Sequence, residues 1–295
     1  MVSIETAASA LATAYGFVVF GVTLFQRRLQ YLPDRRHTPI ALAGLAGGEE
    51  LRLETSDGEL LVAWHFAPKP DRPMVLYFHG AAGALVKRVP RLRLFVEHGF
   101  GLLIVSYRGY SGSTGRPTEA GLMRDAECAY CEACARYGAG QLVIVGTSLG
   151  TGVAVALAAK REARALVLLA PFVSAMDIAA RRFPFLPVRW LMQDSFRSDL
   201  AIPRVRIPVL VIHGECDPVI PIHSAKRLFE LANEPKTFMS VPAGGHIVLD
   251  AGGVFAELCK WIDGVFSQRG SAPLPSPCDG ERALRLVWKR PKSGR

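Results

Sequence analysis

The sequence predicts an α/β fold in which helices flank a mostly parallel sheet. Three observations lead to this class. Short apolar runs of strand length alternate with longer segments of helical periodicity, as βαβ units require. One apolar run, residues 143–145, passes through a glycine-rich turn directly into an alanine-rich helical segment. The chain is 295 residues long and 50% hydrophobic, which is enough for one large core.

The first predicted element is an N-terminal hydrophobic anchor, which we assign to residues 1–30. No charged residue occurs from Thr6 to Gln26, and a helix of that length reaches about 30 Å, the thickness of a bilayer core. Glu5 lies where a secretory signal carries positive charge, and no clear cleavage site follows, so a signal peptide fits less well. A buried or interfacial helix is the other alternative. Because arginines follow the span, the positive-inside tendency predicts a membrane-anchored protein with a cytoplasmic main domain; these are Arg27, Arg28, Arg35 and Arg36.

The main domain is expected over residues 31–267. Its first two strands, residues 51–55 and 60–66, flank a Ser-Asp-Gly-Glu turn that predicts a hairpin. Further strands are predicted at residues 74–78, 102–105, 143–145, 166–169 and 209–212, and helices at 86–97, 118–137, 149–160 and 254–266.

A small insertion over residues 172–206, after the sixth strand, interrupts this alternation. It contains the aromatic and aliphatic stretch from Phe183 to Met192. An insertion here would lie above the carboxyl edge of the sheet, where it could form a cap over an apolar substrate; packing into the core would explain the same residues equally well.

The last segment, residues 268–295, is predicted to be a disordered basic tail. Proline and serine are frequent at 271–277, and seven Lys/Arg residues against Asp279 and Glu281 supply +5 of the chain's net charge of +9. Charge confined to a short tail is a poor argument for a nucleic-acid partner, so we expect none; a solvated tail explains it best, and contact with an anionic membrane surface is the alternative.

The cysteines do not predict disulfides. Cys128, Cys131 and Cys134 recur every three residues within one helical pattern, which places them poorly for pairing with one another. No matching His/Cys pair follows at zinc-site spacing, so we expect no metal and reduced thiols.

The strand, turn and helix around Gly146-Thr147-Ser148-Leu149-Gly150 predict a nucleophile elbow. Small residues flank the serine because a tight strand-to-helix turn leaves no room for larger side chains. The helix N-terminus beneath the serine would supply free N–H groups where an oxyanion develops.

Two later stretches supply the acid and the base that a serine nucleophile needs. Asp217 follows the strand at 209–212, and His246 lies in a glycine-rich loop before the last helix. The chain order Ser148, Asp217, His246 is the order of nucleophile, acid and base in α/β-hydrolases. Asp177 is the reserve acid. His79 and His213 precede glycines at strand ends and are interpreted as structural.

The oxyanion hole is expected to use backbone N–H groups. One belongs to Leu149, the residue after the nucleophile, and the other to the loop after the His79-Gly80 strand end, most plainly Ala81.

The chain resembles the α/β-hydrolase superfamily, and in particular the membrane-anchored serine hydrolases related to the α/β-hydrolase-domain depalmitoylases and Bem-type proteins. The resemblance runs from about residue 6 to 266. Its most specific part is the block at 107–122, and the other parts are residues 26–33, Phe78-His79-Gly80, the elbow, residues 213–217 and Gly245-His246. The family usually has Asn at the positions of Ala81 and Ala84, and Gly at that of Ser111.

This resemblance implies an α/β-hydrolase fold and a serine hydrolase that cleaves carboxylic esters or thioesters, without a cofactor. Small-molecule, acyl-protein or lipid esters are the expected substrates. A serine peptidase or aminopeptidase of the same fold is the alternative enzyme, and a non-catalytic membrane-bound binding module is the alternative outside enzymes.

Overall fold

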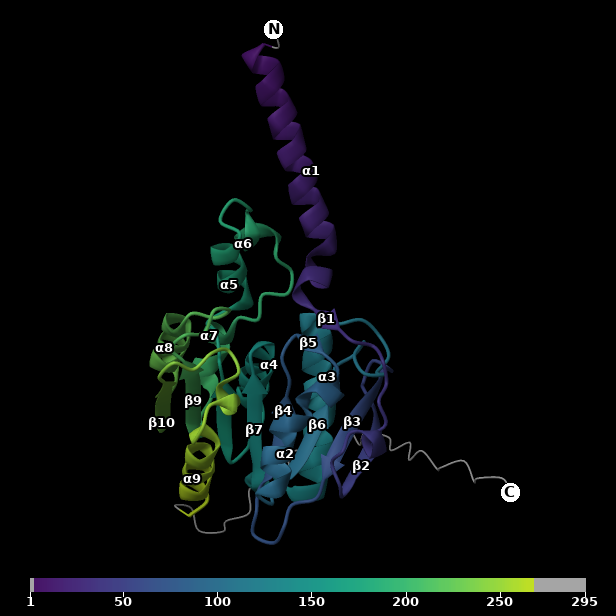
Figure 1. Ribbon diagram of the computed structural model, residues 1–295, viewed down its shortest axis with the longest axis vertical. Helices are drawn as coiled ribbons and strands as arrows, with labels where there is room; N and C mark the ends of the chain where they lie inside the picture. Colours follow the sequence, from purple (N-terminus) through teal and green to yellow (C-terminus); the bar gives the residue numbers. More distant parts are fainter. Residues whose placement is uncertain (1–2, 268–295) are drawn as a thin grey trace, which may run out of the picture.

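The computed structural model describes residues 3–267 and has an eight-stranded sheet at its centre (Figure 1). The strand order is β10-β9-β8-β7-β4-β6-β3-β2. Every neighbouring pair from β10 to β6 is parallel, whereas β6, β3 and β2 pair antiparallel. This confirms the predicted fold class. The strands are β2 (Gly48–Glu54), β3 (Leu60–Phe66), β4 (Met74–Phe78), β6 (Gly101–Val105), β7 (Leu142–Thr147), β8 (Ala165–Leu169), β9 (Val209–Gly214) and β10 (Lys236–Val241).

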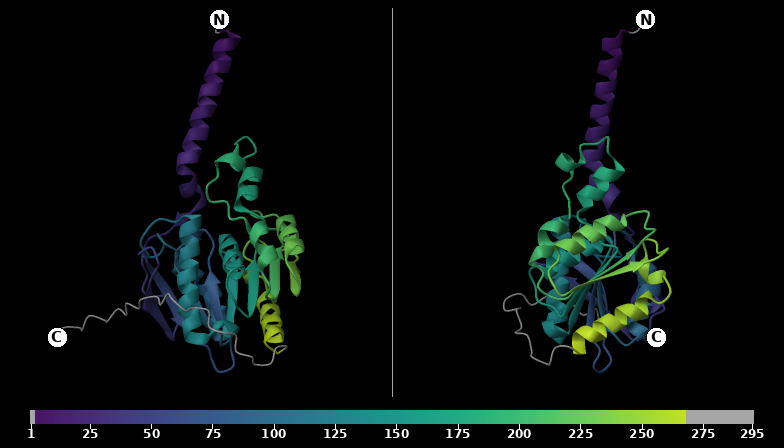
Figure 2. Two further views of the ribbon diagram at one scale, coloured as in Figure 1. Left: turned by 180° about the vertical axis from the view of Figure 1, so that it is seen from behind. Right: turned by 90° about the vertical axis from the view of Figure 1, so that its left-hand side faces the viewer.

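Helices cover both faces of the sheet (Figure 2), and each face has its own core. On one face α3 (Glu119–Tyr137), α4 (Leu149–Ala158) and α8 (Ile222–Leu231) contribute buried side chains. On the other, α2 (Val89–Glu97) and α9 (Val254–Ser267) do so. The central strands are buried on both faces, which explains their continuous apolar sequences. Short 3₁₀ helices complete the domain: η1 (Ile40–Leu42), η2 (Leu85–Arg88), η3 (Ala139–Gln141), η4 (Ile202–Arg204) and η5 (Val248–Asp250).

Strand β10 is the one long strand that the sequence does not predict. Its residues include Lys236, Thr237 and Ser240, so it lacks the apolar run of the other parallel strands. It lies at the edge of the sheet, where it pairs with β9 alone and is only partly buried. Polar residues are tolerated there because an edge strand has fewer neighbours to pack against.

The insertion at residues 172–206 forms three short α-helices, α5 (Ala175–Arg182), α6 (Val188–Leu191) and α7 (Ser198–Ala201), and the 3₁₀ helix η4. Its two ends contribute Phe172 and Phe196 to the core. Its middle does not: Phe183, Phe185 and Trp190 are 42%, 63% and 89% exposed. In Figure 1 α5 and α6 rise above the sheet beside α1. Core packing therefore explains the ends of the insertion but not its aromatic middle.

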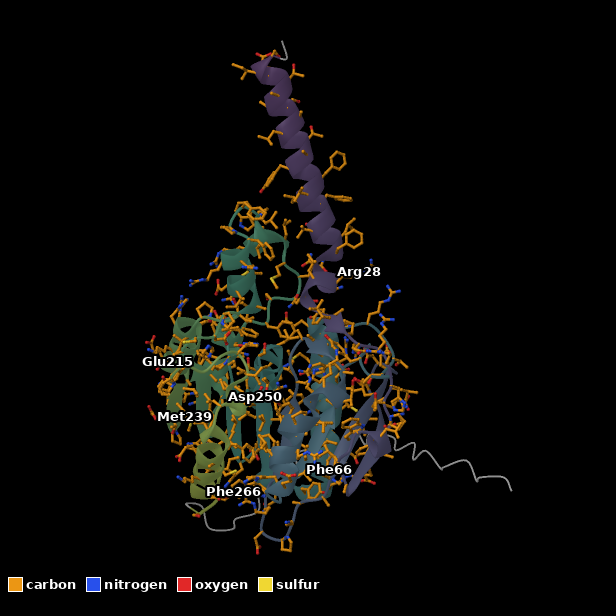
Figure 3. All side chains as sticks on the ribbon, viewed as in Figure 1. Arg28, Phe66, Glu215, Met239, Asp250 and Phe266 are labelled. Atoms are coloured by element: carbon orange, nitrogen blue, oxygen red, sulfur yellow. The ribbon has the colours of Figure 1, made fainter. Side chains whose placement is uncertain are left out.

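The N-terminal helix α1 (Ile4–Gln30) projects from the domain, and none of its residues is buried. It is long and apolar enough to cross a membrane, with a mean hydropathy of 1.8 over an 18-residue window, which is compatible with either a membrane anchor or a signal sequence. Figure 3 shows side chains standing out to the left and right of its upper part, and Arg28 near its foot. The helix is longer than the uncharged span because Ser3 caps its N-terminus and Arg27 and Arg28 occupy its last turn, where cations are favoured.

A two-stranded parallel sheet ties the foot of α1 to the domain. Strand β1 (Leu32–Pro33) pairs with β5 (Ala82–Gly83), and Leu32 is aligned with Ala82. In addition, the Leu32 N–H donates to the carbonyl oxygen of Ala81 at 3.1 Å. The helix thus ends beside the loop that follows β4. The predicted basic tail lies outside the described residues.

Candidate active site

Ser148 lies at the sharp turn between β7 and α4. Its backbone has a φ of 53°, a conformation that costs a non-glycine residue free energy and that marks strained functional turns. The flanking glycines are required because the surrounding backbone leaves no room for a Cβ atom. A Cβ on Gly146 would lie 2.5 Å from the Gly150 carbonyl oxygen, and a Cβ on Gly150 would lie 2.1 Å from that of Phe78. The predicted strand, turn and helix are all present.

The side chains of Ser148, His246 and Asp217 form a continuous hydrogen-bonded chain. The His246 Nε2 lies 2.9 Å from the Ser148 Oγ, and the His246 Nδ1 lies 2.8 Å from the Asp217 Oδ2. Since a carboxylate can only accept, Nδ1 carries the proton, and Nε2 of a neutral imidazole is left to accept from the serine hydroxyl. Such a chain can withdraw the serine proton as the oxygen attacks a carbonyl.

Asp217 is held by the loop that follows β9. Its Oδ1 accepts the N–H groups of Val219 at 2.7 Å and Ile220 at 3.0 Å. Burial by itself would raise the pKa of this carboxyl, but the hydrogen bonds from His246 and the two amides outweigh burial and lower its pKa below the usual value. Asp217 is therefore ionised beside the imidazole.

The loop carrying His246 packs on the end of β9. The Cys216 N–H donates to the Gly244 carbonyl oxygen at 2.9 Å. Gly214 allows this approach, because a Cβ there would lie 2.3 Å from the carbonyl oxygens of both Gly244 and Gly245. A glycine at the strand end thus lets the two loops that carry the acid and the base meet.

The reserve acid Asp177 lies apart from this chain, whereas His213 lies beside it, with its Nε2 3.5 Å from the Asp217 Oδ2. Asp177 is on α5, where it pairs with Arg189 at 2.8 Å. His213 is buried in β9, with its Nε2 2.8 Å from the Ile220 carbonyl oxygen. Burial lowers the pKa of His213, which favours the neutral form of this imidazole.

The loop after β4 lies against Ser148. A Cβ on Gly80 would be 3.3 Å from the Ser148 Cβ, and Ala81, Ser148 and Leu149 line the same cavity. Leu149 is the first residue of α4, where backbone N–H groups have no partner within the helix. The two amides expected from the sequence are thus next to the serine.

Three side chains fix the two peptides of this loop. His79 Nδ1 donates to the Gly80 carbonyl oxygen at 2.7 Å, and Arg88 donates to the same oxygen at 3.2 Å. In a trans peptide the N–H points opposite to the C=O, so holding the Gly80 oxygen also fixes the direction of the Ala81 N–H. The Tyr110 hydroxyl donates to the Ala81 carbonyl oxygen at 2.7 Å.

His79 is suited to this structural role because it is neutral. It is buried between Tyr107, with ring centroids 4.2 Å apart, and Tyr110, at 5.3 Å. Burial, with a smaller effect from the nearby Arg88, lowers its pKa to about 3. The sequence interpretation of His79 as structural thus agrees with its surroundings, although its contact with the Gly80 peptide was not expected.

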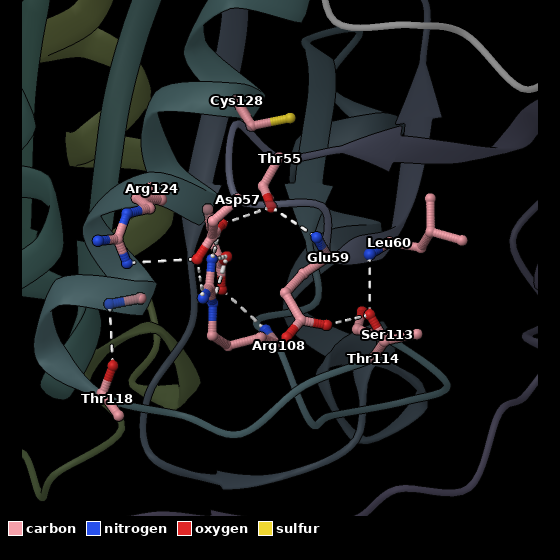
Figure 4. A network of polar contacts seen from close by, with 12 residues as sticks. Thr55, Asp57, Glu59, Leu60, Arg108, Ser113, Thr114, Thr118, Arg124 and Cys128 are labelled. Atoms are coloured by element: carbon pink, nitrogen blue, oxygen red, sulfur yellow. Dashed lines mark hydrogen bonds and ion pairs between the residues drawn. The ribbon is translucent and has the colours of Figure 1, made fainter.

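Arg108 anchors the Tyr-Arg-Gly-Tyr block through ion pairs (Figure 4). Its guanidinium donates to Asp57, at the tip of the β2–β3 hairpin, at 2.8 and 3.0 Å, and to the buried Asp125 of α3 at 2.8 Å. Arg124 also pairs with Asp57, at 3.3 Å. Ser111 follows with a φ of 44°, which explains why glycine suits this position, and its Oγ accepts the Leu85 N–H at 2.9 Å. The block connects the hairpin, α3 and the loop beside Ser148.

A cavity of about 350 Å³ opens from Ser148 toward α1 and the insertion. Its walls are mostly apolar. The sequence did not lead us to expect the N-terminal helix in the cavity wall. The signal for it was a set of polar residues at helical spacing in or next to an apolar span, namely Thr23, Gln26 and Gln30. The lining residues are Val19, Val22, Thr23, Gln26, Leu29 and Gln30 of α1, Ala81, Ser148, Leu149, Phe172, Ala175, Ile178, Ala179, Arg182, Phe183, Leu186, Val188, Leu191, Met192, Val219 and Ile220.

Within residues 3–267, no group of three or more His, Cys, Asp or Glu side chains is placed to hold a metal ion. Cys128, Cys131 and Cys134 lie buried along α3, on a single helix as expected.

Comparison with known proteins identifies the family. The family model described as alpha/beta hydrolase fold matches residues 73–194. An uncharacterized protein of Mycobacterium tuberculosis, Rv2307c, is 40% identical over 240 residues, covering 78% of this chain and 84% of that protein. The alpha/beta hydrolase domain-containing protein WAV2 of Arabidopsis thaliana is 31% identical, over 80% of this chain and 88% of that protein. The protein bem46 of Schizosaccharomyces pombe is 34% identical, over 67% of this chain and 70% of that protein.

Solved structures agree on the fold. The esterase Pf2001 of Pyrococcus furiosus superposes with a TM-score of 0.62 at 16% identity, over 81% of this chain and 97% of that chain. The α/β hydrolase GrgF from Penicillium sp. sh18 gives a TM-score of 0.62 at 18% identity, over 75% and 98%. With its sheet order, its serine turn and relatives of this similarity, the chain belongs to the α/β-hydrolase family, in the group that includes the Bem46 and α/β-hydrolase-domain proteins.

Proposed function

We propose that this α/β hydrolase is a membrane-anchored serine hydrolase that cleaves carboxylic esters or thioesters. The observation that carries the proposal is the chain from Ser148 Oγ through His246 to Asp217, at 2.9 and 2.8 Å, opening into an apolar cavity. Neither a cofactor nor a metal takes part in the proposed reaction.

The reaction has two steps. The Ser148 Oγ attacks the acyl carbon, His246 takes the hydroxyl proton, and the resulting imidazolium is stabilised by Asp217. The bond to the alcohol or thiol then breaks, and His246 returns the proton to that leaving group. Water, deprotonated by the same imidazole, attacks the acyl-enzyme, which releases the carboxylic acid and regenerates the serine.

The negative oxygen of each tetrahedral intermediate would be held by the N–H groups of Leu149 and Ala81. Such a donor contributes roughly 3 kcal/mol to transition-state stabilisation in comparable sites. The contacts of His79, Arg88 and Tyr110 with the Gly80 and Ala81 carbonyl oxygens support this assignment, because they fix the loop before substrate arrives.

The exposed apolar surface of α1 supports a membrane anchor. Its arginines follow the span and favour a cytoplasmic domain. The insertion would then act as a cap beside the anchor. A peptidase of the same fold is less well supported, because the cavity that meets Ser148 is lined mainly by aliphatic and aromatic side chains suited to an acyl chain. A binding module without chemistry would not require the aligned serine, histidine and aspartate.

The test is hydrolysis of p-nitrophenyl esters of increasing acyl length, and of an acyl thioester, by the detergent-solubilised full-length chain. Ser148→Ala should abolish turnover and labelling by a fluorophosphonate probe, whereas Ser267→Ala, at the end of α9, should match the parent protein. Labelling at Ser148 with cleavage of aminoacyl-anilides but not esters would indicate a peptidase. Folded protein with neither labelling nor turnover would indicate a binding module.

A further inference from the structure

The anchor helix contributes one side of the cavity that ends at Ser148. The cavity-lining residues of α1 recur at helical spacing and form one stripe from Val19 to Gln30, which extends about 16 Å along the helix. The opposite surface is apolar and largely exposed: Phe17, Phe20 and Leu24 are 72%, 63% and 61% exposed. One face of α1 is thus suited to lipid, and the other faces the cavity.

Polar contacts hold α1 against the insertion at several heights. The Tyr15 hydroxyl donates to the Phe185 carbonyl oxygen at 2.7 Å. Gln26 donates to the Leu191 carbonyl oxygen at 3.2 Å and accepts the Gln193 N–H at 2.8 Å. At the foot of the helix, Arg27 pairs with the buried carboxylate of Asp194 at 2.8 Å. The helix and the insertion therefore form two sides of one cavity, held together by hydrogen bonds at its rim.

The tip of the insertion, residues 183–190, lies beside the apolar part of α1. Phe183, Phe185 and Trp190 are exposed there, and Tyr15, about four turns above the foot of α1, contacts this tip. Aromatic side chains at such a position are typical of the membrane–water interface. With α1 in a bilayer, the tip would dip into the interface, and the upper part of the cavity would lie at the level of the lipid chains.

We propose that the space between α1 and the insertion is the acyl-binding site and the lateral entrance for a lipid-resident acyl ester. The acyl chain would slide from the bilayer along the Val19–Gln30 stripe, and its carbonyl would reach Ser148 without passing through water. Arg182 is the one charged residue among those that line the described cavity, so the space favours a hydrocarbon chain. This inference rests on the proposed function and adds that the anchor is part of the substrate site.

The first test blocks the cavity from α1. Val22→Trp places a large side chain in the lining stripe, whereas the matched control Leu24→Trp places the same side chain on the opposite apolar surface, where Leu24 is 61% exposed. Full-length protein is reconstituted in phosphatidylcholine vesicles and assayed with a membrane-resident palmitoyl ester and with a soluble butyryl ester. We expect Val22→Trp to lower kcat/KM for the palmitoyl ester about tenfold or more, with little effect on the butyryl ester. Leu24→Trp should stay within about twofold of the parent protein for both. Equal effects of the two variants would overturn the inference.

A second measurement does not depend on turnover. Palmitate carrying a diazirine on its chain is added to the same vesicles, and the adducts are mapped after irradiation. Ile178 and Leu191 face the cavity from the insertion, so we expect adducts there that decline in Val22→Trp and persist in Leu24→Trp. Adducts confined to the exposed face of α1 would overturn the lateral site even if ester hydrolysis is observed. Adducts at Ile178 and Leu191 without ester hydrolysis would support the lipid site and refute the proposed serine hydrolase function.

Discussion

The Tyr110 hydroxyl donates to the carbonyl oxygen of Ala81 at 2.7 Å, which joins the Tyr-Arg-Gly-Tyr block to the loop beside Ser148. Tyr110→Phe removes this hydrogen bond and keeps the ring that packs on His79. Because the Ala81 peptide would become less well fixed, we expect kcat to fall about tenfold and the free energy of unfolding to fall by about 1 kcal/mol.

Tyr130→Phe is the matched control for that change. It removes a comparable hydrogen bond, to the Glu162 carbonyl oxygen at 2.8 Å, outside the site. Steady-state kinetics and urea unfolding should show a similar loss of stability with kcat unchanged. Equal kcat values for the two variants would refute a positioning role of Tyr110.

Gly150→Ala should disrupt the turn at Ser148. Its Cβ would lie 2.1 Å from the Phe78 carbonyl oxygen, which is backbone and cannot easily move aside. We expect a loss of about 3 kcal/mol or more of unfolding free energy, or no folded protein. Gly264→Ala in α9 meets nothing within 4 Å and should stabilise the helix by up to about 1 kcal/mol. Circular dichroism and thermal unfolding of both variants check the contrast, and a normally stable Gly150→Ala would show that α4 lies farther from β4.

Asp217→Asn should lower kcat by roughly a thousandfold or more, because the amide cannot hold the imidazole in the required tautomer or stabilise its charged form. The pKa of Asp217 is lowered in the folded protein. Its carboxylate therefore stabilises the fold above pH 3.8, the usual pKa, and this stabilisation is lost as the pH falls through the lowered folded-state pKa. From about pH 5 to about 8, Asp217 should therefore contribute no titration to the rate profile. The profile of Asp217→Asn should be depressed at every pH, and that of Asp177→Asn should match the parent.

The charged cluster at Arg108 should make stability depend on acid pH. The hydrogen bond from Arg108 holds the pKa of Asp57 well below its usual 3.8. A lowered folded-state pKa stabilises the protein above 3.8, and this stabilisation is lost as the pH falls through the folded value. Asp57→Asn should cost about 1 kcal/mol at neutral pH, reduced by solvent screening because the side chain is 33% exposed, and nearly nothing at low pH.

Asp125, the second carboxylate that pairs with Arg108, should matter more for stability than Asp57. Asp125 has a fully buried side chain, so Asp125→Ala would leave Arg108 without its buried partner and should cost about 3–5 kcal/mol. Asp263→Asn, at a half-exposed ion pair with Arg72, should change stability by less than about 0.5 kcal/mol. Urea unfolding across the pH range measures all three variants. A pH-independent effect of Asp57→Asn would contradict the charge-based explanation.

Local sequence was sufficient for much of this molecule. The alternating apolar runs determined the α/β class, because strands buried on both faces must be continuously apolar. The glycines around Ser148 determined the turn, because larger side chains would collide with backbone there. The order of Ser148, Asp217 and His246 predicted which side chains meet, since loops after parallel strands share one edge of a sheet.

Tertiary structure decided what surrounds Ser148. The contacts of His79, Arg88 and Tyr110 with one loop join positions up to 29 residues apart, and no periodicity encodes such contacts. The same holds for the cavity, whose walls come from α1 and from an insertion more than 150 residues later. A hydrophobic span has the same composition whether its sides face lipid, core or substrate. Only the docking of α1 on the insertion, through Gln26, Arg27 and Asp194, separates the exposed apolar face of the helix from the face that lines the cavity.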